Sequence, residues 1–368
     1  MPPRRPPTNT RESPIAAPLL EWHEREGRHD LPWQTRRTPY RVWVSEIMLQ
    51  QTQVAAVRPY YARFVRRFPD VGTLAAASVD EVLHSWSGLG YYARARNLHR
   101  AAELICAEFG GELPHSFAEL ARLPGVGRST AGAILALSYG ERFPILDGNV
   151  RRVLSRYFGV AGGRATAAGV KRLWELSERC TPAARVAEYT QAVMDLGATV
   201  CVRSRPLCAC CPLAADCFAR RTGRQHEFPA PRTARARRAR RVFMVVALHE
   251  NGSVLLERRP ENGVWGGLWS LPEFDTATAA QAFIRQSLVT SVPEPQPLST
   301  VEHAFTHFSL SINPLLVHCA GAAPVMEEGA SLWYNVRAPV RIGLPAPISA
   351  LLQRLAHRSM FDAPVAAT

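Results

Sequence analysis

Lysine is almost absent from this 368-residue sequence: Lys171 is the only one among its 44 Lys and Arg residues. Schiff-base catalysis needs a side-chain amine, so almost no position here can supply it. Long apolar runs are absent too, because no stretch approaches the roughly 20 residues that cross a bilayer. The first ten residues, rich in Pro and Arg, lack the apolar segment of a secretory signal. We therefore expect neither a transmembrane, a secreted nor a collagen-like protein.

The composition is that of a globular protein with a basic surface. Hydrophobic residues make up 47% and charged residues 20%, which is enough apolar mass for a core. The length predicts about two to three domains. The 44 basic residues exceed the 31 acidic ones, giving a formal net charge of +13. Such an excess predicts an anionic partner, of which nucleic acid is the commonest.

Four of the eight cysteines fall in one stretch, Cys201-x6-Cys208-x2-Cys211-x5-Cys217. Four thiolates so close in sequence are typical of structural zinc or of an iron–sulfur cluster. Zinc sites generally show two CxxC pairs and only one is present here, so the spacing favours a [4Fe–4S] cluster. Cys210 lies between two of these cysteines and could replace Cys208 or Cys211 as a ligand.

The chain shows four regions of different composition. Residues 1–14 are expected to form a disordered tail, and residues 15–225 have a helical pattern punctuated by Pro and Gly. Residues 226–241 are predicted to be a basic linker. Residues 242–360 predict an α+β domain, with a hairpin at Asn251-Gly252 and later two short strands within Phe308–Cys319.

A glycine-rich turn joins two predicted helices at Leu123–Thr130, and Arg128–Tyr139 forms the second helix. Gly125 and Gly127 would let the backbone approach a phosphate closely, and the first N–H groups of the second helix would point at it. This is the pattern of a helix–hairpin–helix. A plain αα-hairpin fits the turn equally well, but the net positive charge favours DNA binding.

Several long motifs carry a family resemblance. Leu123–Gly132, Asp147–Val150 and the cysteine spacing resemble the endonuclease III superfamily of DNA glycosylases. Val44–Val54 and Gly88–Asn97 are similar to the adenine DNA glycosylases of the MutY type. The likeness covers about residues 15 to 360.

This resemblance implies a multidomain fold. Its first part would be an all-α helix–hairpin–helix glycosylase, with a six-helix core at about residues 31–139 and a cluster domain built from both flanks. An α+β Nudix-like domain would follow. The implied cofactor is a [4Fe–4S] cluster, with Cys201, Cys208, Cys211 and Cys217 as its ligands.

The implied reaction is removal of adenine mispaired with 8-oxoguanine or guanine in double-stranded DNA, after the base has left the stack. Glu46 matches the acid that protonates adenine at N7. The helical period surrounds it with apolar and amide side chains and with no cation, so burial would raise its pKa. Asp147 matches the carboxylate that stabilises the sugar. Taken alone, Glu46 could be a solvated helix residue and Asp147 a helix N-cap.

Further site residues follow from the same resemblance. Tyr139 and Asn149 correspond to residues that orient Asp147 and the incoming water, and Gln191 to one that contacts the adenine edge. Trp33 and Gln34 are expected to line the pocket. Gln51 and Tyr91 correspond to residues wedged into the duplex beside the oxidised guanine.

Lyase members of the superfamily place a catalytic lysine directly after the Gly-x-Gly-Arg of the hairpin. Ser129 occupies that position here, and Lys171 lies well outside the motif. Because a Schiff base needs an amine, we expect base removal by water without strand cleavage.

The C-terminal region resembles Nudix hydrolases, chiefly at Trp265–Pro272. The carboxylate-rich box that would bind Mg²⁺ is missing, since only Glu273 and Asp275 are acidic between residues 273 and 288. The family's segment that reads 8-oxoguanine is filled here by Phe305, Thr306 and His307. We therefore expect a reader of oxidised guanine and no hydrolysis of nucleotides.

Three other functions compete with this interpretation: a glycosylase/lyase of the same superfamily, a non-catalytic DNA-binding scaffold, and a nucleotide-pool hydrolase. Ser129 argues against the glycosylase/lyase, and the retained carboxylates argue against the non-catalytic scaffold. The missing Nudix box argues against the nucleotide-pool hydrolase. We expect a monomer in the bacterial cytoplasm, associated with the nucleoid and not with a membrane.

Overall fold

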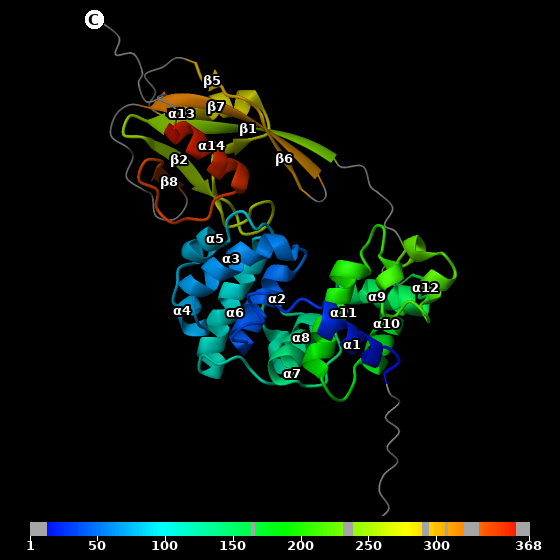
Figure 1. Ribbon diagram of the computed structural model, residues 1–368. Helices are drawn as coiled ribbons and strands as arrows, with labels where there is room; N and C mark the ends of the chain where they lie inside the picture. The colour runs from blue at the N-terminus through cyan, green and yellow to red at the C-terminus, as the bar shows by residue number, and fades with distance from the viewer. Residues whose placement is uncertain are drawn as a thin grey trace, which may run out of the picture. The chain divides into compact units, whose positions relative to one another are not determined.

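A computed structural model describes residues 13–162, 166–230, 238–288, 294–305, 308–319 and 331–357. Contacts within the chain divide it into two compact units (Figure 1). Unit 1 comprises residues 1–75 and 100–233, and unit 2 comprises residues 76–99 and 234–368. In the described part of the chain, no helix has both the length and the apolarity needed to span a membrane.

Unit 1 is helical. Its helices are α1 (Ala16–Glu26), α2 (Pro39–Leu49), α3 (Val54–Arg67), α4 (Val71–Ala75), α7 (Phe117–Arg122), α8 (Arg128–Tyr139), α9 (Gly148–Phe158), α10 (Ala167–Cys180), α11 (Val186–Asp195) and α12 (Phe218–Arg221). A π-helical turn, η1 (Leu196–Val200), continues α11, and two short 3₁₀ turns follow, η2 (Cys208–Cys210) and η3 (Gln225–Glu227). The long helix α6 (Ala93–Phe109) begins in the unit 2 segment and ends in unit 1.

Helix α8 lies at the centre of unit 1. Every residue from Ala131 to Leu137 is buried, and α2, α7 and α11 pack around the helix. A helix that is apolar on all sides must be covered on all sides. At Gly132, a Cβ atom would lie only 2.7 Å from the carbonyl oxygen of Pro144. This close approach brings the segment that ends at Asp147 against α8.

The turn before α8 has the predicted form. Gly125 has φ +80°, a left-handed conformation that favours glycine, and the Val126 amide donates to the Leu123 carbonyl at 3.0 Å. The predicted helix Arg128–Tyr139 is confirmed, and Gly140 ends it with φ +72°.

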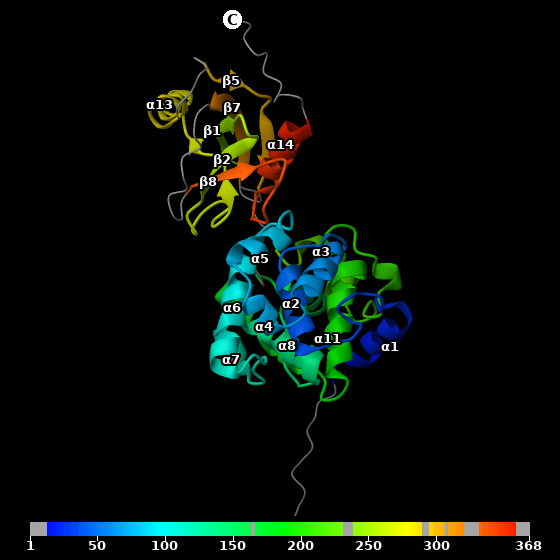
Figure 2. The ribbon, with the colours of Figure 1, turned by 90° about the vertical axis from the view of Figure 1, so that its left-hand side faces the viewer.

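Unit 2 holds a mixed sheet of eight strands within the described residues, in the order β3-β2-β1-β7-β5, with β4 paired to β1, β6 to β7 and β8 to β2. The strands are β1 (Arg238–His249), β2 (Ser253–Arg258), β3 (Trp269–Ser270), β4 (Glu273–Phe274), β5 (Gln296–Pro297), β6 (Val301–Ala304), β7 (Phe308–Cys319) and β8 (Ser331–Asn335). Its helices are α5 (Val79–Trp86), α13 (Ala277–Ser287) and α14 (Ala346–His357). Figures 1 and 2 show α13 and α14 on opposite faces of the sheet.

The two covered faces explain the sequence of β1. Residues 244–248 are all buried, because alternate side chains point to opposite faces and both faces are covered. The predicted hairpin is confirmed, with Gly252 at φ +84° between antiparallel β1 and β2. The prediction of two short strands within Phe308–Cys319 is wrong, since β7 runs unbroken and pairs in parallel with β1 along its whole length. Pro314 is tolerated because it lies between the parts of β7 that pair with β6 and with β5.

Candidate active site

Glu46 lies on α2, which begins at an N-cap made by the Thr38 side chain, followed by Pro39 at the first helical position. Val42 and Trp43, one turn before it, are buried. Burial and, as the smaller cause, the negative charge of Asp147 together raise the pKa of the Glu46 carboxyl to about 8. The fold therefore brings the two predicted carboxyl groups into electrostatic contact and keeps Glu46 protonated at neutral pH.

Asp147 is the N-cap of α9, and its Oδ1 accepts a hydrogen bond from the Val150 amide at 2.8 Å. Burial raises the pKa of this carboxyl, while the amides of Val150 and Asn149 and the charges of Arg152 and Arg151 oppose that rise. The capping role and the catalytic role are thus compatible. Donors that favour the ionised form surround Asp147, whereas Glu46 has a second negative charge beside it, so the shared proton belongs on Glu46.

Asn149 is fixed between α9 and η1. Its Oδ1 accepts from Nη2 of Arg152 at 2.8 Å, and the same nitrogen donates to the Gly197 carbonyl at 2.5 Å. A Cβ atom at Gly197 would lie 2.6 Å from that of Asn149, so only glycine allows this approach. Arg152 also donates to the Cys201 carbonyl at 2.7 Å. Arg152 was not predicted as a site residue, although it lies one helical turn beyond the Asp-Gly-Asn motif.

The structure does not bring Tyr139 to Asp147. Tyr139 is the last residue of α8, is 37% exposed and packs on the His115 ring with centroids 3.9 Å apart. Ser129, in the first turn of α8, accepts a hydrogen bond from the amide of Leu146 at 3.0 Å, directly before Asp147. Ten residues of helix separate the two, about 15 Å along the axis. The expected role of Tyr139 is therefore corrected, and Ser129 takes the place beside Asp147.

The predicted adenine contact, Gln191, is buried on α11, which packs against α8 and α9. Its Nε2 donates to Asp195 at 3.0 Å. Trp33 is buried edge-on against Tyr61, with ring centroids 5.4 Å apart. Gln34 turns its Oε1 back to the Leu31 amide at 3.2 Å. These are packing and turn contacts, and the place of Trp33 and Gln34 in the pocket stays a prediction.

The two predicted wedge residues share an unusual backbone. Gln51 has φ +58° and is exposed, and Tyr91 has φ +50° and is 39% exposed. Left-handed backbone is strained for residues other than glycine and is found often at functional sites. In the hairpin, the Gly125 carbonyl accepts from Gln50 at 3.2 Å, and nothing lies within 4 Å of where a Cβ of Gly127 would be.

The four predicted cysteine ligands line one small cavity, together with residues that include Arg156, Leu207 and Gln225. Burial, with smaller contributions from the other three cysteines, raises the pKa of the Cys211 thiol to about 12, so all four sulfur atoms lie within electrostatic range. Among the described residues, no group of three or more His, Cys, Asp or Glu side chains is placed to hold a metal ion. A four-iron cluster spreads its thiolates farther apart than a single ion does, because each thiolate binds a different iron.

Buried Arg156 ties the cysteine loop to α9. Its guanidinium donates to the carbonyls of Val202 at 2.7 Å, Arg203 at 3.0 Å and Phe228 at 3.0 Å, and lies 3.4 Å from the Cys201 Sγ. Arg156 was missed by sequence reasoning. The signal that could have found it is its spacing: Arg156 lies four residues after Arg152 on α9, so the two side chains share one face of that helix.

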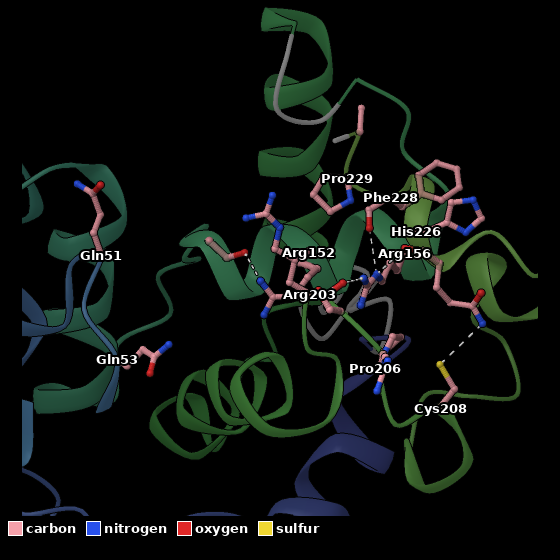
Figure 3. Close-up of a pocket in the computed structure, with 15 residues that line it drawn as sticks. Gln51, Gln53, Arg152, Arg156, Arg203, Pro206, Cys208, His226, Phe228 and Pro229 are labelled. Carbon is pink, nitrogen blue, oxygen red and sulfur yellow. Dashed lines mark hydrogen bonds between the residues drawn. The ribbon is translucent and has the colours of Figure 1, made fainter. Parts of the chain in front are cut away.

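A basic groove runs beside this loop. Its lining includes Arg152, Arg156, Arg203, Arg205, His226, Gln51 and Gln53. Figure 3 shows Gln51 and Gln53 across the groove from Arg152 and Arg203. Exposed Arg203 and Arg205 lie between the first two cysteines. Within unit 1, one cationic surface suited to phosphates is thus formed. It is bordered by the N-terminus of α9, by the cysteine loop and by Gln51.

In unit 2, the carboxylates that remain of a Nudix box are engaged elsewhere. Glu273 pairs with Arg259 at 2.8 Å and with Arg240 at 2.9 Å, and Asp275 pairs with Arg240 at 3.2 Å. Within the described residues, this pairing occupies both carboxylates, and no group of three or more His, Cys, Asp or Glu side chains is placed to hold Mg²⁺. Phe305 stacks on Phe308 with centroids 4.5 Å apart. Thr306 and His307 lie outside the described residues.

Comparisons with known proteins agree with this architecture. Residues 44–179 match the HhH-GPD superfamily of base excision DNA repair proteins, and residues 243–354 match the NUDIX domain. An adenine DNA glycosylase of Buchnera aphidicola subsp. Acyrthosiphon pisum (strain APS) is 37% identical over 336 residues, covering 91% of this chain and 95% of the relative. That of Homo sapiens is 33% identical over 369 residues, covering 83% and 67%.

Solved structures agree as well. A thermostable thymine-DNA glycosylase is similar to 56% of this chain and to 95% of its own, with a TM-score of 0.52 and 27% identity. The predicted fold class and the predicted enzyme class are thereby confirmed. This chain belongs to the adenine DNA glycosylase family, the base excision repair enzymes that combine a helix–hairpin–helix glycosylase domain with a Nudix-like domain.

Proposed function

We propose that this enzyme hydrolyses the N-glycosidic bond of adenine mispaired with 8-oxoguanine or guanine in duplex DNA, and that it leaves the strand uncut. The observation that carries the proposal is the pair formed by Glu46 and Asp147. One is an acid whose pKa is raised to about 8, and the other is a carboxyl held by amide donors at a helix N-terminus. Two carboxyl groups with opposed environments are what acid-assisted glycoside cleavage requires.

The two groups divide the work. Adenine leaves poorly as an anion, so Glu46 donates its proton to N7 and lets the base depart neutral. The sugar left behind carries positive charge, which ionised Asp147 stabilises. Asn149, held by Arg152, orients Asp147 and the incoming water. Only one proton is shared by the pair below about pH 8, and the amide donors at Asp147 place it on Glu46.

The target base must leave the stack, which costs a few kcal/mol and least at a mismatch. Gln51 and Tyr91, both exposed on strained backbone, serve as the wedges that support the opened duplex. The hairpin at Gly125 and Gly127 binds a phosphate without reading sequence, and the basic groove of unit 1 follows the backbone.

Ser129 supports a monofunctional reaction. Its hydroxyl lies against the amide that precedes Asp147, where a lysine would reach the sugar. A serine hydroxyl cannot form a Schiff base, so water is the nucleophile that ends the reaction and the abasic strand stays intact.

A [4Fe–4S] cluster fits the cavity of unit 1, because four thiols surround it and the chain offers no acidic groups in its lining. Cys201, Cys208, Cys211 and Cys217 would hold it. When bound, the cluster would supply a rigid crosslink between distant points of this loop. Arg156 and Arg152 hold the same loop from α9 through its carbonyl oxygens.

Unit 2 is proposed to read the oxidised guanine through Phe305, Thr306 and His307. Phe305 packs against Trp265 and Phe308, and these aromatic contacts fix its position between β6 and β7. Replacement of His307 by alanine is then expected to lower the preference for A:8-oxoguanine over A:G. An unchanged preference would remove this part of the proposal. We infer that the enzyme acts as a monomer at the bacterial nucleoid, where its DNA substrate lies.

The proposed function is tested by incubating the protein with a duplex that contains one A:8-oxoguanine pair, and measuring free adenine and strand breaks separately. We expect adenine release at a single site, and strand breaks only after alkali. Matched duplexes with A:T or C:8-oxoguanine serve as controls. Failure to release adenine would contradict the glycosylase assignment, and breaks without alkali would contradict the monofunctional one.

A further inference from the structure

A buried polar cluster joins α1, the segment after it and the end of α11. Asp195, whose side chain is fully buried, is its centre. Its Oδ1 accepts from Nε of Arg28 at 3.0 Å and from Nη2 at 2.5 Å, and its Oδ2 accepts from the Arg28 amide at 3.0 Å. His23 lies 3.5 Å from Oδ2. The fifth contact is the amide of Gln191, whose Nε2 donates to Oδ1 at 3.0 Å.

Asp195 is ionised in this setting. Burial alone would raise the pKa of its carboxyl, but the neighbouring His23 and the charge and donors of Arg28 bring it below its ordinary value. An ionised carboxylate accepts hydrogen bonds and donates none. Gln191, one helical turn earlier on α11, must therefore present its NH₂ group to Asp195 and turn its carbonyl Oε1 away.

With its NH₂ group bound to Asp195, the Gln191 amide has its carbonyl oxygen, Oε1, left to bind a ligand. Within the described residues its Oε1 makes no hydrogen bond, although the side chain is only 6% exposed. The oxygen is not among the fully buried side-chain atoms of the described residues that lack a partner, so it stays reachable from solvent. A ligand can therefore supply the donor that this acceptor lacks. α11 packs against α8 and α9, which carry Ser129 and Asp147, so this acceptor belongs to the helices that build the active site.

We propose that Asp195 is a positioning residue that sets base selectivity, holding the Gln191 amide so that its Oε1 accepts from an amino group at C6 of the purine. This rests on the proposed function, in which Gln191 contacts the adenine edge. A purine with an oxygen at C6, such as hypoxanthine, meets two opposed acceptors. A site built to receive one hydrogen bond rejects a base that cannot make it far more strongly than shape alone can.

The position of Asp195 suits this role. It is the last residue of α11, directly before the π-helical turn η1, and Thr199 donates to its carbonyl oxygen at 2.8 Å. Single π-helical turns inside helices occur frequently at functional sites. Arg152 holds the turn through the Gly197 carbonyl near its start and through the Cys201 carbonyl just after its end. Asp195 therefore has little freedom to move away from Gln191.

The test uses the full chain and duplexes carrying adenine, hypoxanthine or unsubstituted purine opposite 8-oxoguanine. Single-turnover rates give the ratio of adenine to hypoxanthine release for each variant, so that the intrinsic lability of each base cancels between variants. In Asp195→Asn, the new amide can donate to Oε1 of Gln191, and the side chain can turn over. We expect the ratio to fall by at least about tenfold.

Gln191→Met keeps the volume but has no amide to orient, and it leaves the pair of Asp195 and Arg28 in place. It is expected to lose the same selectivity, and the double variant should lose no more. Ser177→Ala, which removes a buried hydroxyl bonded to the Ile145 carbonyl at 2.7 Å, is the matched control and should lower both rates alike.

Two results would overturn the proposal. One is a folded Asp195→Asn variant with an unchanged ratio. The other is a Gln191→Met variant that keeps its preference for adenine, and this outcome decides the matter even if Asp195→Asn does not fold. A wild-type protein that releases no adenine would instead sink the proposed function, which keeps the two failures distinct.

Discussion

Each unit of this chain contains a carboxyl group that the sequence analysis singled out, yet the surroundings of the two groups are opposite. In unit 1, burial and a second carboxyl raise the pKa of Glu46 to about 8. In unit 2, Glu273 is paired with two arginines at 2.8 and 2.9 Å. A half-buried acid beside a second carboxyl group is poised to give up a proton, whereas a carboxylate paired with two arginines stays ionised.

The difference shows that neighbouring arginines decide whether a carboxyl group can act as an acid. The sheet of unit 2 still has helices on both faces, and Glu273 now ties β4 to Arg240 of β1. In unit 1 the arginines do not pair with Glu46. Arg152 donates to Asn149 and its charge lowers the pKa of Asp147, but no cation contributes to the pKa of Glu46. The following changes test that contrast.

The largest effect is expected at Glu46. Glu46→Gln keeps the shape but cannot donate a proton, so the rate of adenine release should fall about 10²- to 10⁴-fold. The melting temperature should not fall, because the variant removes a carboxyl whose ionisation is disfavoured by burial. Single-turnover assays with a melting curve for each protein check both. A glutamine variant with near wild-type turnover would place the acid elsewhere.

Asp147→Asn separates catalysis from helix capping. Asparagine is as good an N-cap as aspartate, so α9 should remain intact. The anion that stabilises the sugar is lost, and the rate should fall about 10²- to 10³-fold. Circular dichroism and adenine release measure the two roles. Unfolding together with the loss of activity would mean that the carboxylate is structural.

The cysteine loop offers a matched pair of variants. Cys211→Ser should abolish iron binding and weaken binding to duplex DNA, because the loop that carries Arg203 and Arg205 loses its crosslink. Cys210→Ser should keep both, since Cys210 is exposed and contacts the Leu207 carbonyl. Iron and sulfide content, with DNA binding at two salt concentrations, provides the readout. Loss of iron from the Cys210 variant would reassign that ligand.

Sequence patterns predicted much of this site because its determinants are local. Asp147 followed by Gly-Asn is a helix start, and the helix face around Glu46 lacks cations. The misplaced residue is Tyr139, which is assigned by its resemblance to a family residue but lies at the end of α8, ten residues from Ser129. The tertiary contact from Leu146 to Ser129 decides this position, and no local pattern encodes it.

The sheet shows the same limit. Phe308–Cys319 contains a proline that predicts a break, and only the pairing of β7 with β5 and β6 on either side of Pro314 allows one continuous strand. The network of Asp195, Arg28 and Gln191 was likewise invisible, because its members are up to 167 positions apart in the chain.

Ser129→Lys is expected to have a smaller and opposite effect, a gain. An amine at this position lies beside the Asp147 segment, within reach of the sugar, so some strand cleavage without alkali should appear. Borohydride should trap a covalent adduct with DNA in this variant and not in the wild type. Absence of any adduct would show that the site excludes a lysine side chain from the sugar.

The smallest effect is expected in unit 2. Glu273→Gln removes the carboxylate partner of Arg259 and leaves Arg240 with Asp275 alone, which should cost about 1–3 kcal/mol of stability. Adenine release should be unchanged, and neither protein should hydrolyse nucleoside triphosphates with Mg²⁺. Denaturant unfolding and a phosphate-release assay test this. Hydrolysis of nucleoside triphosphates by the wild type would contradict the inference that the ion-paired carboxylates of unit 2 carry no chemistry.

The pH dependence of single-turnover adenine release tests the central claim most directly. Glu46 is protonated below a pKa of about 8 and deprotonated above it, so the rate should fall as the pH rises through about 8. The residual rate of Glu46→Gln should lack this high-pH limb. A wild-type rate that stays level or increases across that range would contradict proton donation by Glu46.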